Sequence, residues 1–544
     1  MNYECLTKDQ SEYQELSLAL PAIETDNKRF LIAGVSGVLR WAIKSHIEKF
    51  SNHFSKSLLG FRGGCLAACA EGSVWTNFCE VQLPSSVCEM KFTMNDEEES
   101  VVIPPSLVLL EAHLKRPVRT HNILKRKLDI AKKAKQVRSK ESQTNTSINA
   151  PVTNIEFTVY DNNLDPIKSD DISKTLENLI ITEKSEEFSL HHNYLEGIDL
   201  TLADMIAFPC VYYLLKNLPS EVLTHLEDVK KWFERMFSNL FVKKAATKCG
   251  FLLNTFFPIK EDMTKKIIVP VVDKDSLYKR DPTHTKMRCK HKNPIEILTL
   301  LQFLEWEKLP PDLHPATGDL PQERIERKCQ QIESMVTAVL KVAIDGQIIV
   351  EFCAGGGHVG LLLAYFLPSC KVILIENKES SILRAKKRVE SLNLKNVFFY
   401  QCNLDYFKGS FDLGVSLHAC GVATDLVIQQ CIKQRASFVC CPCCYGGVQN
   451  THLLSYPLSK RFCSTSISYE KYLFLAHCAD RTEVNTPTAE QGELCMGLID
   501  SDRAFFAQEY NYKVLLTTLQ PKSCSPKHNL LIGKSPKLQE IVTV

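Results

Sequence analysis

The chain has 544 residues, of which 44% are hydrophobic and 24% are charged, a composition typical of globular proteins. Sixty-five Lys and Arg residues nearly balance 63 Asp and Glu residues, which leaves a formal net charge of +2. The composition excludes a disordered, collagenous or coiled-coil chain. The charge balance excludes a chain that binds polyanions through its bulk charge, so any nucleic-acid surface would have to be local.

Hydropathy and cysteine usage predict a soluble, intracellular protein. No stretch reaches the ~18 apolar residues that a membrane helix needs, and the longest apolar run, at 205–215, contains Pro209. The segment 1–14 is polar and mixed in charge, unlike a secretory signal. We therefore expect a cytoplasmic chain with access to the nucleus left open, and no membrane association. We interpret its 22 cysteines as free thiols rather than as disulfides.

Periodicity and composition divide the chain into five parts. Apolar residues at helical spacing begin at Leu31, and a second helix is expected over 65–78. A charged and then Ser/Thr/Asn-rich stretch with few aromatic residues predicts a disordered insertion. The resulting parts are a helical region at 1–110, a linker at 111–190, further helices at 191–260, a connector at 261–320 and an α/β domain at 321–544.

The linker begins with a strongly basic segment. Residues 115–140 contain eleven Lys or Arg residues against the single acid Asp129, a net charge of +10. Such a cluster can bind RNA or serve as a nuclear-import signal, and it can equally be a solvated flexible arm. We take it as the candidate RNA-binding element and keep the solvated arm as the alternative.

The helices that follow residue 194 have an informative pattern. Thr201-Leu202-Ala203-Asp204 has the form of a capping box, and the next helix is apolar almost all round, as a central helix of a bundle would be. With Gly197 and the run at 229–236, this pattern resembles the C-terminal helical domain of glutathione transferases. No segment before residue 190 reads as the thioredoxin-like half that activates glutathione. We therefore predict a structural or protein-docking module without glutathione transferase activity.

Strands alternate with helices from residue 347 onward, which predicts a doubly wound α/β sheet. A short, nearly continuous apolar run such as Gln347–Phe352 is typical of a central parallel strand. A strand hairpin is expected to close the domain. The predicted strands are 347–352, 371–375, 397–401, 411–417, 437–441, 494–499 and 513–519.

A glycine-rich loop follows the first of these strands. Gly355, Gly357 and Gly360 have the spacing of a dinucleotide-binding fingerprint, and Glu376 ends the next strand, where it can bind ribose hydroxyls. NAD is therefore one candidate ligand. Glu351, however, lies inside the first strand, close to the start of the loop. An acid at this position suits S-adenosylmethionine, which carries an ammonium group at the place where NAD carries a pyrophosphate. We expect an α/β Rossmann-like class I methyltransferase domain, with S-adenosylmethionine as its cofactor, preceded by an all-α module.

The segment after the fourth strand is the most specific in the chain. It reads Leu417-His418-Ala419-Cys420-Gly421-Val422-Ala423-Thr424-Asp425, followed by Cys440-Cys441-Pro442-Cys443-Cys444-Tyr445-Gly446. With the upstream helices, it resembles the family of glutathione S-transferase C-terminal domain-containing proteins and, more distantly, transfer-RNA 2′-O-methyltransferases. The resemblance covers residues 28–80 and 190–540 and implies methyl transfer from S-adenosylmethionine.

The loop, the strand ends and this resemblance give a set of candidate cofactor residues. Glu351 would orient the ammonium group and Glu376 would bind the ribose diol. Asn403, with Asp405 as the other candidate, would lie at the adenine edge, and an acidic strand start such as Asp412 is typical of methyltransferases. The predicted cofactor-binding residues are Glu351, Cys353, Gly355, Gly356, Gly357, Gly360, Glu376, Asn403 and Asp412.

Three residues are predicted to act in catalysis: His418, Cys420 and Asp425. His418 follows a strand at the edge where open α/β sheets bind ligands and could take a proton from the methyl acceptor, or it could only shape the loop. Asp425 could instead cap the following helix. For the thiols at 440–444 we weigh zinc, completed by Cys420 and His418, against buried thiols and a substrate-side role, and predict no metal.

These features predict an S-adenosylmethionine-dependent methyltransferase with RNA as the candidate acceptor. The alternative is an adaptor whose methyltransferase fold no longer turns over and whose helices bind a protein partner. The intact glycine loop with Glu351 and Glu376 favours cofactor binding in either case.

Overall fold

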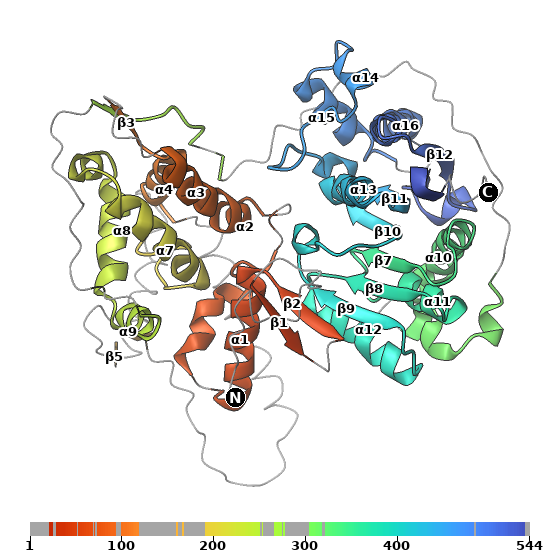
Figure 1. The fold of residues 1–544 in the computed structure, drawn as a ribbon, viewed down its shortest axis with the longest axis horizontal. Coiled ribbons are helices and arrows are strands. Elements are labelled where there is room, and N and C mark those ends of the chain that lie inside the picture. Colours follow the sequence, from red (N-terminus) through yellow and green to blue (C-terminus); the bar gives the residue numbers. More distant parts are fainter. Residues whose placement is uncertain are drawn as a thin grey trace, which may run out of the picture.

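A computed structural model describes residues 21–118, 191–277 and 304–317 with short gaps, residues 321–482 and 486–538, and two short strands near residue 160. These residues form two lobes, one helical and one built on a large sheet (Figure 1). Most of the basic segment 115–140 and the polar linker after it lie outside the described residues. Among the helices that are described, none is long and apolar enough to cross a membrane.

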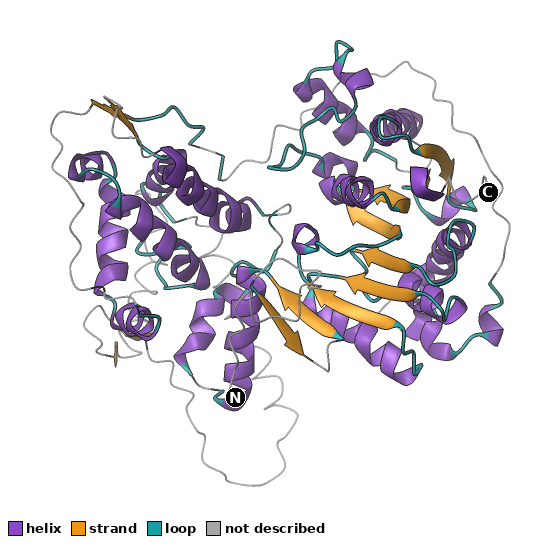
Figure 2. Cartoon of the chain, in the orientation of Figure 1, coloured by secondary structure: helices purple, strands orange, loops and turns teal. Residues whose placement is uncertain are grey.

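A nine-stranded mixed sheet forms the centre of the second lobe, with the order β1-β2-β9-β8-β7-β10-β11-β13-β12 (Figure 2). The strands from β2 to β11 in this order are parallel, and β1, β13 and β12 add antiparallel edges. The strands are β1 Ala22–Thr25, β2 Phe30–Ala33, β7 Ile348–Phe352, β8 Lys371–Ile375, β9 Val397–Gln401, β10 Leu413–Cys420, β11 Ser437–Cys443, β12 Lys513–Thr518 and β13 Asn529–Lys534.

Helices cover both faces of this sheet and bury two separate apolar cores. One face carries α10 Gln322–Leu340, α11 His358–Phe366 and α12 Glu379–Ser391. The other face carries α13 Val422–Gln434, α14 Lys460–Cys463, α15 Tyr469–Cys478 and α16 Pro487–Gln508. Central strands such as β7 and β8 are apolar on both sides because helices cover both sides. The predicted doubly wound fold with a closing β12–β13 hairpin is confirmed.

Three secondary-structure predictions are wrong. Residues 30–33 form strand β2, which pairs in parallel with β9, and helix α1 Val35–Lys49 begins only after Gly34. The predicted strand 494–499 lies inside α16, and among the described residues of the predicted helix 65–78 helix begins only at Val74, with α2 Val74–Asn77 running into a π-helix at Phe78–Gln82. The first two errors have one cause: a short apolar run fits a buried strand and a buried helix equally well.

The helical lobe packs around a third core of its own. Its longer helices are α3 Leu83–Thr93, α4 Pro105–Leu114, α7 Leu202–Lys216, α8 Glu227–Ser238 and α9 Leu240–Lys248. The capping box predicted at the start of α7 is present. Two small sheets accompany the main one: β3 Ser100–Val102 pairs with β6 Lys266–Ile268, and β4 Val159–Tyr160 pairs with β5 Pro166–Ile167.

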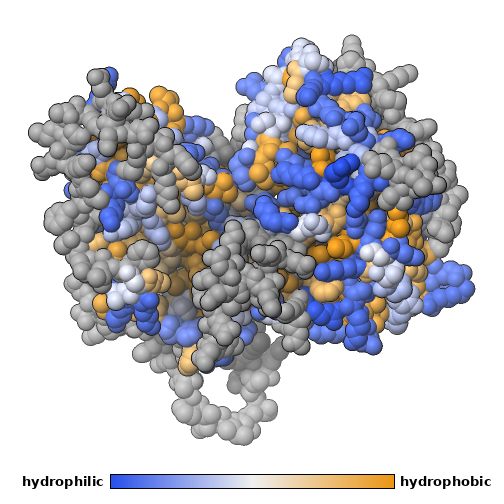
Figure 3. Space-filling view, viewed as in Figure 1, coloured by the Kyte–Doolittle hydropathy of each residue, from blue (hydrophilic) through white to orange (hydrophobic). Residues whose placement is uncertain are grey.

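Helix α1 connects the two lobes. It follows β2 of the large sheet, while Val35 and Ile43 pack against the core of the helical lobe. Lys44 of α1 forms an ion pair with Glu379 of α12, and Tyr406 donates a hydrogen bond to Glu80 at 3.2 Å. In Figure 3 apolar residues are visible on the helical lobe beside this junction, whereas the sheet lobe presents a more hydrophilic surface in the same view.

Candidate active site

The glycine-rich loop joins β7 to α11 at the carboxyl edge of the sheet, as the sequence predicted. Gly355 and Gly357 have φ values of 55° and 70°, so the chain turns in a conformation that favours glycine. A Cβ on Gly360 would lie 2.3 Å from the Leu374 side chain and 2.6 Å from the Glu351 carboxylate. Glycine at 360 therefore lets the first turn of α11 pack directly on β7 and β8.

Glu351 points from β7 to the N-terminus of α11. Its carboxylate is buried and accepts a 2.8 Å hydrogen bond from the N–H of Gly360 and a further one from the N–H of Val359. Burial raises the pKa of this carboxyl group to about 7, against the opposing effects of the Gly360 N–H and the nearby Lys328 ammonium. The acid is therefore poised between its charged and neutral forms near neutral pH.

Glu376 ends β8 and supports the glycine loop from the other side. Its two carboxylate oxygens accept the N–H groups of Gly355 and Lys378, each at 2.8 Å. Each oxygen has a second lone pair, so the carboxylate can accept two further hydrogen bonds from a ligand. Its place one strand along from Glu351 agrees with the predicted role at a ribose diol.

Helix α10 contributes two residues that sequence reasoning missed, Lys328 and Gln331. The Lys328 ammonium interacts electrostatically with Glu351, Cys441 and Cys443, and burial lowers its pKa. Within the described part of the chain, it forms no hydrogen bond or ion pair. In the sequence both residues belong to the ordinary polar pattern of an amphipathic helix, so only the fold reveals that α10 covers this edge of the sheet.

A second pair outside the predicted set, His358 and Arg388, holds the glycine loop from the α12 side. The Arg388 guanidinium donates to the Gly356 carbonyl at 3.0 Å, and its Nη1 lies 3.0 Å from Nδ1 of His358. Burial and the Arg388 charge lower the pKa of His358 to about 3, which keeps this imidazole neutral as an acceptor. These contacts fix the loop before any ligand binds.

His418 lies in a β-bulge at the end of β10. The register with β11 shifts between Leu417 and Ala419, and His418 has a φ of 66°. The bulge turns its side chain toward α10, where Nε2 lies 3.0 Å from Oε1 of Gln331. Burial, with a smaller effect of the Lys328 charge, lowers the pKa of His418 to about 4. Gln331 Oε1 can only accept, so Nε2 carries the proton and Nδ1 is a proton acceptor.

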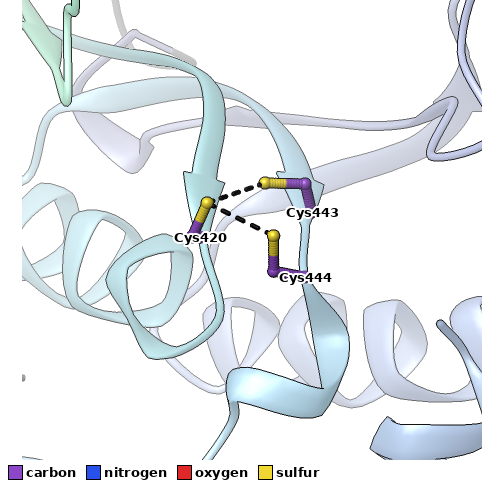
Figure 4. Close-up of side chains that lie close together, drawn as sticks. All are labelled: Cys420, Cys443 and Cys444. Carbon is purple, nitrogen blue, oxygen red and sulfur yellow. Dashed lines mark hydrogen bonds between the residues drawn. The ribbon is translucent and has the colours of Figure 1, made fainter. Parts of the chain in front are cut away.

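Three thiols gather beyond the same strand ends and form the thiol cluster, defined as Cys420, Cys443 and Cys444 (Figure 4). Sγ of Cys420 lies 3.3 Å from Sγ of Cys443 and 3.3 Å from Sγ of Cys444. Cys420 and Cys444 are exposed, whereas Cys443 is buried. Cys440 and Cys441, which the sequence grouped with them, are buried in β11 and take no part in the cluster.

Asp425, predicted as catalytic, lies in a buried network behind the site. Its carboxylate accepts hydrogen bonds from Arg503 Nε at 2.6 Å, from Arg503 Nη2 at 2.9 Å and from the Tyr456 hydroxyl at 2.6 Å. Arg503 also pairs with Asp500, which accepts from the Tyr445 hydroxyl at 2.7 Å. We therefore correct the assignment: Asp425 positions α13 and the turn that holds Tyr445, and it does not face the loop edge.

Asp412 is the other predicted residue whose position contradicts its assignment. It precedes β10, and its carboxylate accepts the N–H of Ile348 at the start of β7. The glycine loop follows the other end of β7, so Asp412 lies at the opposite edge of the sheet and cannot contact the same ligand. The acidic residue fixes the register of two strands instead.

Cys353 and Asn403 lie at the predicted edge. Cys353 is the first loop residue after β7 and has a φ of 54°. Asn403 follows β9 and lines a cavity of about 480 Å³ between α1 and the sheet lobe. Basic side chains also line this cavity, including Arg40, Lys44 and Lys378. Asp405, the alternative to Asn403, has a buried oxygen without a hydrogen-bond partner in the described structure.

Comparisons with known proteins agree with the class that this sheet and loop define. A family profile described as "Methyltransferase domain" matches residues 324–451, which include the glycine loop, Glu376 and the thiol cluster. A solved SAM-dependent methyltransferase from Aquifex aeolicus is 14% identical, with a TM-score of 0.22 over 37% of this chain and 89% of that chain. The sheet lobe has a Rossmann-like fold by its own strand order, and residues 324–451 within it match the methyltransferase profile.

Relatives extend over the whole chain rather than this domain alone. A mouse glutathione S-transferase C-terminal domain-containing protein is 38% identical over 94% of this chain and 85% of its own length. A Drosophila melanogaster homolog of that protein is 36% identical over 96% of this chain and 86% of its own length. The chain therefore belongs to the family of glutathione S-transferase C-terminal domain-containing proteins.

Proposed function

We propose that the protein is a methyltransferase that takes its methyl group from S-adenosylmethionine. The observation that carries the proposal is the pair of acids, Glu351 and Glu376, that flank one glycine-rich loop at the carboxyl edge of the sheet. An NAD loop needs donors for a pyrophosphate, whereas this loop begins beside a buried carboxylate and matches a cofactor with an ammonium group and a ribose.

The described residues fit both ends of this cofactor's amino-acid portion. Glu351 offers a carboxylate to the ammonium group, and the Lys328 ammonium, which forms no ion pair with a described residue, offers a cation to the carboxylate. The two side chains interact electrostatically: Lys328 belongs to α10, and Glu351 lies against the first turn of α11 on the sheet face that both helices cover. A zwitterionic amino acid is the ligand that such a buried pair of opposite charges would bind.

His418 is the residue placed to accept a proton during transfer. S-Adenosylmethionine supplies a methyl group bonded to a sulfonium, and the acceptor atom must lose a proton as it is methylated. His418 is neutral at physiological pH, and Nδ1 remains available when Nε2 donates to Gln331. Lys328 interacts electrostatically with both Glu351 and His418, and His418 contacts Gln331 of the same helix, which supports a single site for the proposed base and the proposed cofactor acids.

Titration calorimetry with S-adenosylhomocysteine, and with NAD as the control, tests the proposed cofactor. We expect heat of binding for S-adenosylhomocysteine only, and we expect Glu376→Ala to weaken it about tenfold or more because a ribose loses its charged acceptor. Glu390→Ala, which removes an exposed acid at the C-terminal end of α12, is the matched control and should leave affinity unchanged. Binding of NAD in preference to S-adenosylhomocysteine would overturn the proposal.

RNA remains the proposed class of methyl acceptor, and it rests on the sequence of the basic segment 115–140. Contacts between its Lys and Arg residues and phosphates would make binding strongly salt-dependent. Mass spectrometry of RNA nucleosides from cells that lack the gene tests this class directly. Loss of one methylated nucleoside is the expected result, and an unchanged nucleoside profile together with a missing protein methylation would contradict it.

The adaptor hypothesis makes a different prediction for the same site. In a chain that binds S-adenosylhomocysteine but never transfers a methyl group, Glu351 and Glu376 would still bind the cofactor, whereas His418 would have no part in a reaction. Incubation with labelled S-adenosylmethionine and total cellular RNA or protein separates the two, since only the enzyme transfers label. Label that depends on His418 supports the enzyme.

A further inference from the structure

The thiol cluster is not needed for binding the proposed cofactor, and its geometry suggests a separate role. All three Sγ atoms lie within 4.8 Å of one another, and two of the three separations are 3.3 Å. Sulfur ligands of a tetrahedral zinc ion, with Zn–S distances of about 2.3 Å, lie about 3.8 Å apart. Small side-chain rotations would therefore bring the three sulfurs to coordination distance of one ion.

The backbone holds the three cysteines together before any ligand binds. The bulge at His418 sets Cys420 opposite Cys443 in the β10–β11 ladder, and Cys444 is the next residue. The loops that follow Cys420 and Cys444 approach closely at Gly421 and Gly447. A Cβ added to Gly421 would lie only 2.6 Å from the Gly447 carbonyl oxygen. A side chain at 421 would force the loops apart, so glycine there is required for the cluster.

A shell of hydrogen bonds then fixes the turn that follows Cys444. Asp480 accepts the N–H groups of Tyr445 at 2.9 Å and Gly446 at 2.8 Å, and Lys527 lies 3.5 Å from the same carboxylate. Tyr445 is anchored in turn to Asp500. Cys444 itself has a φ of 49°, an uncommon conformation for a residue other than glycine that these contacts hold in place. Metal sites depend on such outer contacts to orient their ligands.

We infer that Cys420, Cys443 and Cys444 form a zinc site with three protein ligands and one open coordination position. Thiolates are preferred ligands of zinc, and binding would release the thiol protons. Lys328 and Lys527, which both interact electrostatically with Cys443, would balance the negative charge of the three thiolates. The sequence alone predicted no metal because the cysteine run at 440–444 begins inside a strand, where alternate residues point to opposite faces.

The open position faces outward, because Cys420 and Cys444 are exposed and Cys443 is buried. Three protein ligands with a free fourth position are characteristic of zinc sites that bind a water molecule or a substrate. The site also lies at the carboxyl end of β10, the strand that carries His418. The inference does not depend on methyl transfer, since zinc can bind whether or not the chain is an enzyme.

Metal titration of the reduced full-length chain tests this inference. After removal of metal with a chelator, the protein should take up one zinc ion per chain, and cobalt(II) should produce thiolate-to-cobalt charge-transfer absorption. Cys420→Ser and Cys444→Ser alter exposed residues and should each weaken zinc binding by about tenfold or more, a range typical of altered metal sites. Cys463→Ser, at an exposed thiol of the same domain outside the cluster, should bind zinc like the unaltered chain.

Two outcomes overturn the inference. One is a chain that takes up no zinc although its circular dichroism shows it folded, and the other is zinc binding that Cys420→Ser and Cys444→Ser leave unchanged. Affinity for S-adenosylhomocysteine, measured on the same samples, separates this inference from the proposed function. Cofactor binding without zinc contradicts the metal site alone, and zinc binding without cofactor contradicts the methyltransferase alone.

Discussion

Asp204 in the helical lobe and Glu351 in the sheet lobe are both buried acids beside the N-terminus of a helix, α7 and α11 respectively. Asp204 accepts four hydrogen bonds, from Leu195 N, Thr201 N, Thr201 Oγ1 and Trp232 Nε1, at 2.8–3.2 Å. Glu351 accepts backbone N–H groups from Val359 and Gly360, and Lys328, a cation that interacts with it electrostatically, forms no ion pair within the described structure.

The difference separates an acid that holds a fold together from one that can bind a ligand. The lone pairs of Asp204 are used within the lobe, so the carboxylate fixes the start of α7 and the position of α8 through Trp232. Glu351 and Lys328 instead interact electrostatically without forming an ion pair in the described structure, so a ligand that carries both charges can bind each of them. Asp425, with three short hydrogen bonds to Arg503 and Tyr456, belongs with Asp204.

The largest effect on stability should come from disrupting the buried hydrogen-bond network around Asp425. Arg503→Met would leave Asp425 and Asp500 buried without their cation, and we expect a loss of about 3–5 kcal/mol in the free energy of unfolding. Urea denaturation measures this loss. Lys433→Met, on the exposed side of α13, is the control and should change stability by about 0.5 kcal/mol or less. A stable Arg503→Met variant that lacks activity would instead return Asp425 to the catalytic residues.

His418→Ala should affect catalysis rather than folding or cofactor binding. Removal of a general base lowers kcat by about 100-fold or more, while the affinity for S-adenosylhomocysteine should stay almost unchanged. Gln331→Ala frees Nε2 of His418 without removing the imidazole and should cause a smaller loss. Parallel losses of cofactor affinity and stability in His418→Ala would assign His418 to the structure of the bulge.

Glu351 should make cofactor affinity depend on pH. Its pKa in the free protein is raised to about 7 by burial, and the ammonium group of the cofactor binds the ionised carboxylate. Affinity should therefore fall as the pH drops below about 7, approaching tenfold per pH unit, and should level off above it. Calorimetry across this pH range measures the slope. Glu351→Gln should bind more weakly with a much flatter profile, and an equal slope in that variant would contradict the assignment.

The sequence was sufficient for features that are local in the chain. The glycine loop, Glu376 and the strands from β7 to β11 follow from short patterns, because turn chemistry and burial act over a few residues. Strand β2 was missed because its parallel partner, β9, lies more than 360 residues further along the chain, and β1 joins the sheet only through β2. No local pattern distinguishes residues 30–33, which join the sheet, from the apolar start of a helix.

For the candidate site too, the sequence indicated the residues on the strands and the loops that follow them, but not the residues that helix α10 contributes. Glu351 and His418 follow from their places on strands, whereas Lys328 and Gln331 depend on how α10 lies over the sheet edge. The thiol cluster depends on the bulge at His418, which a regular alternation of residues along β10 and β11 does not predict. Asp412 was assigned to the cofactor because an acidic strand start is typical of methyltransferases. The sequence pattern did not show that this residue lies at the edge of the sheet opposite the glycine loop.

The contrast between Asp204, whose hydrogen bonds are all made within its lobe, and Glu351, which can still bind a ligand, is tested most directly with two variants. These are Lys328→Met and Asp204→Asn, and both S-adenosylhomocysteine affinity and thermal unfolding are measured on the same samples. We predict that Lys328→Met weakens binding by about 10–100-fold without lowering stability, since the ligand carboxylate loses a charged partner. Asp204→Asn should lower the stability of the helical lobe and leave cofactor affinity unchanged. Full affinity in Lys328→Met, with Asp204→Asn the weaker binder, would contradict the account.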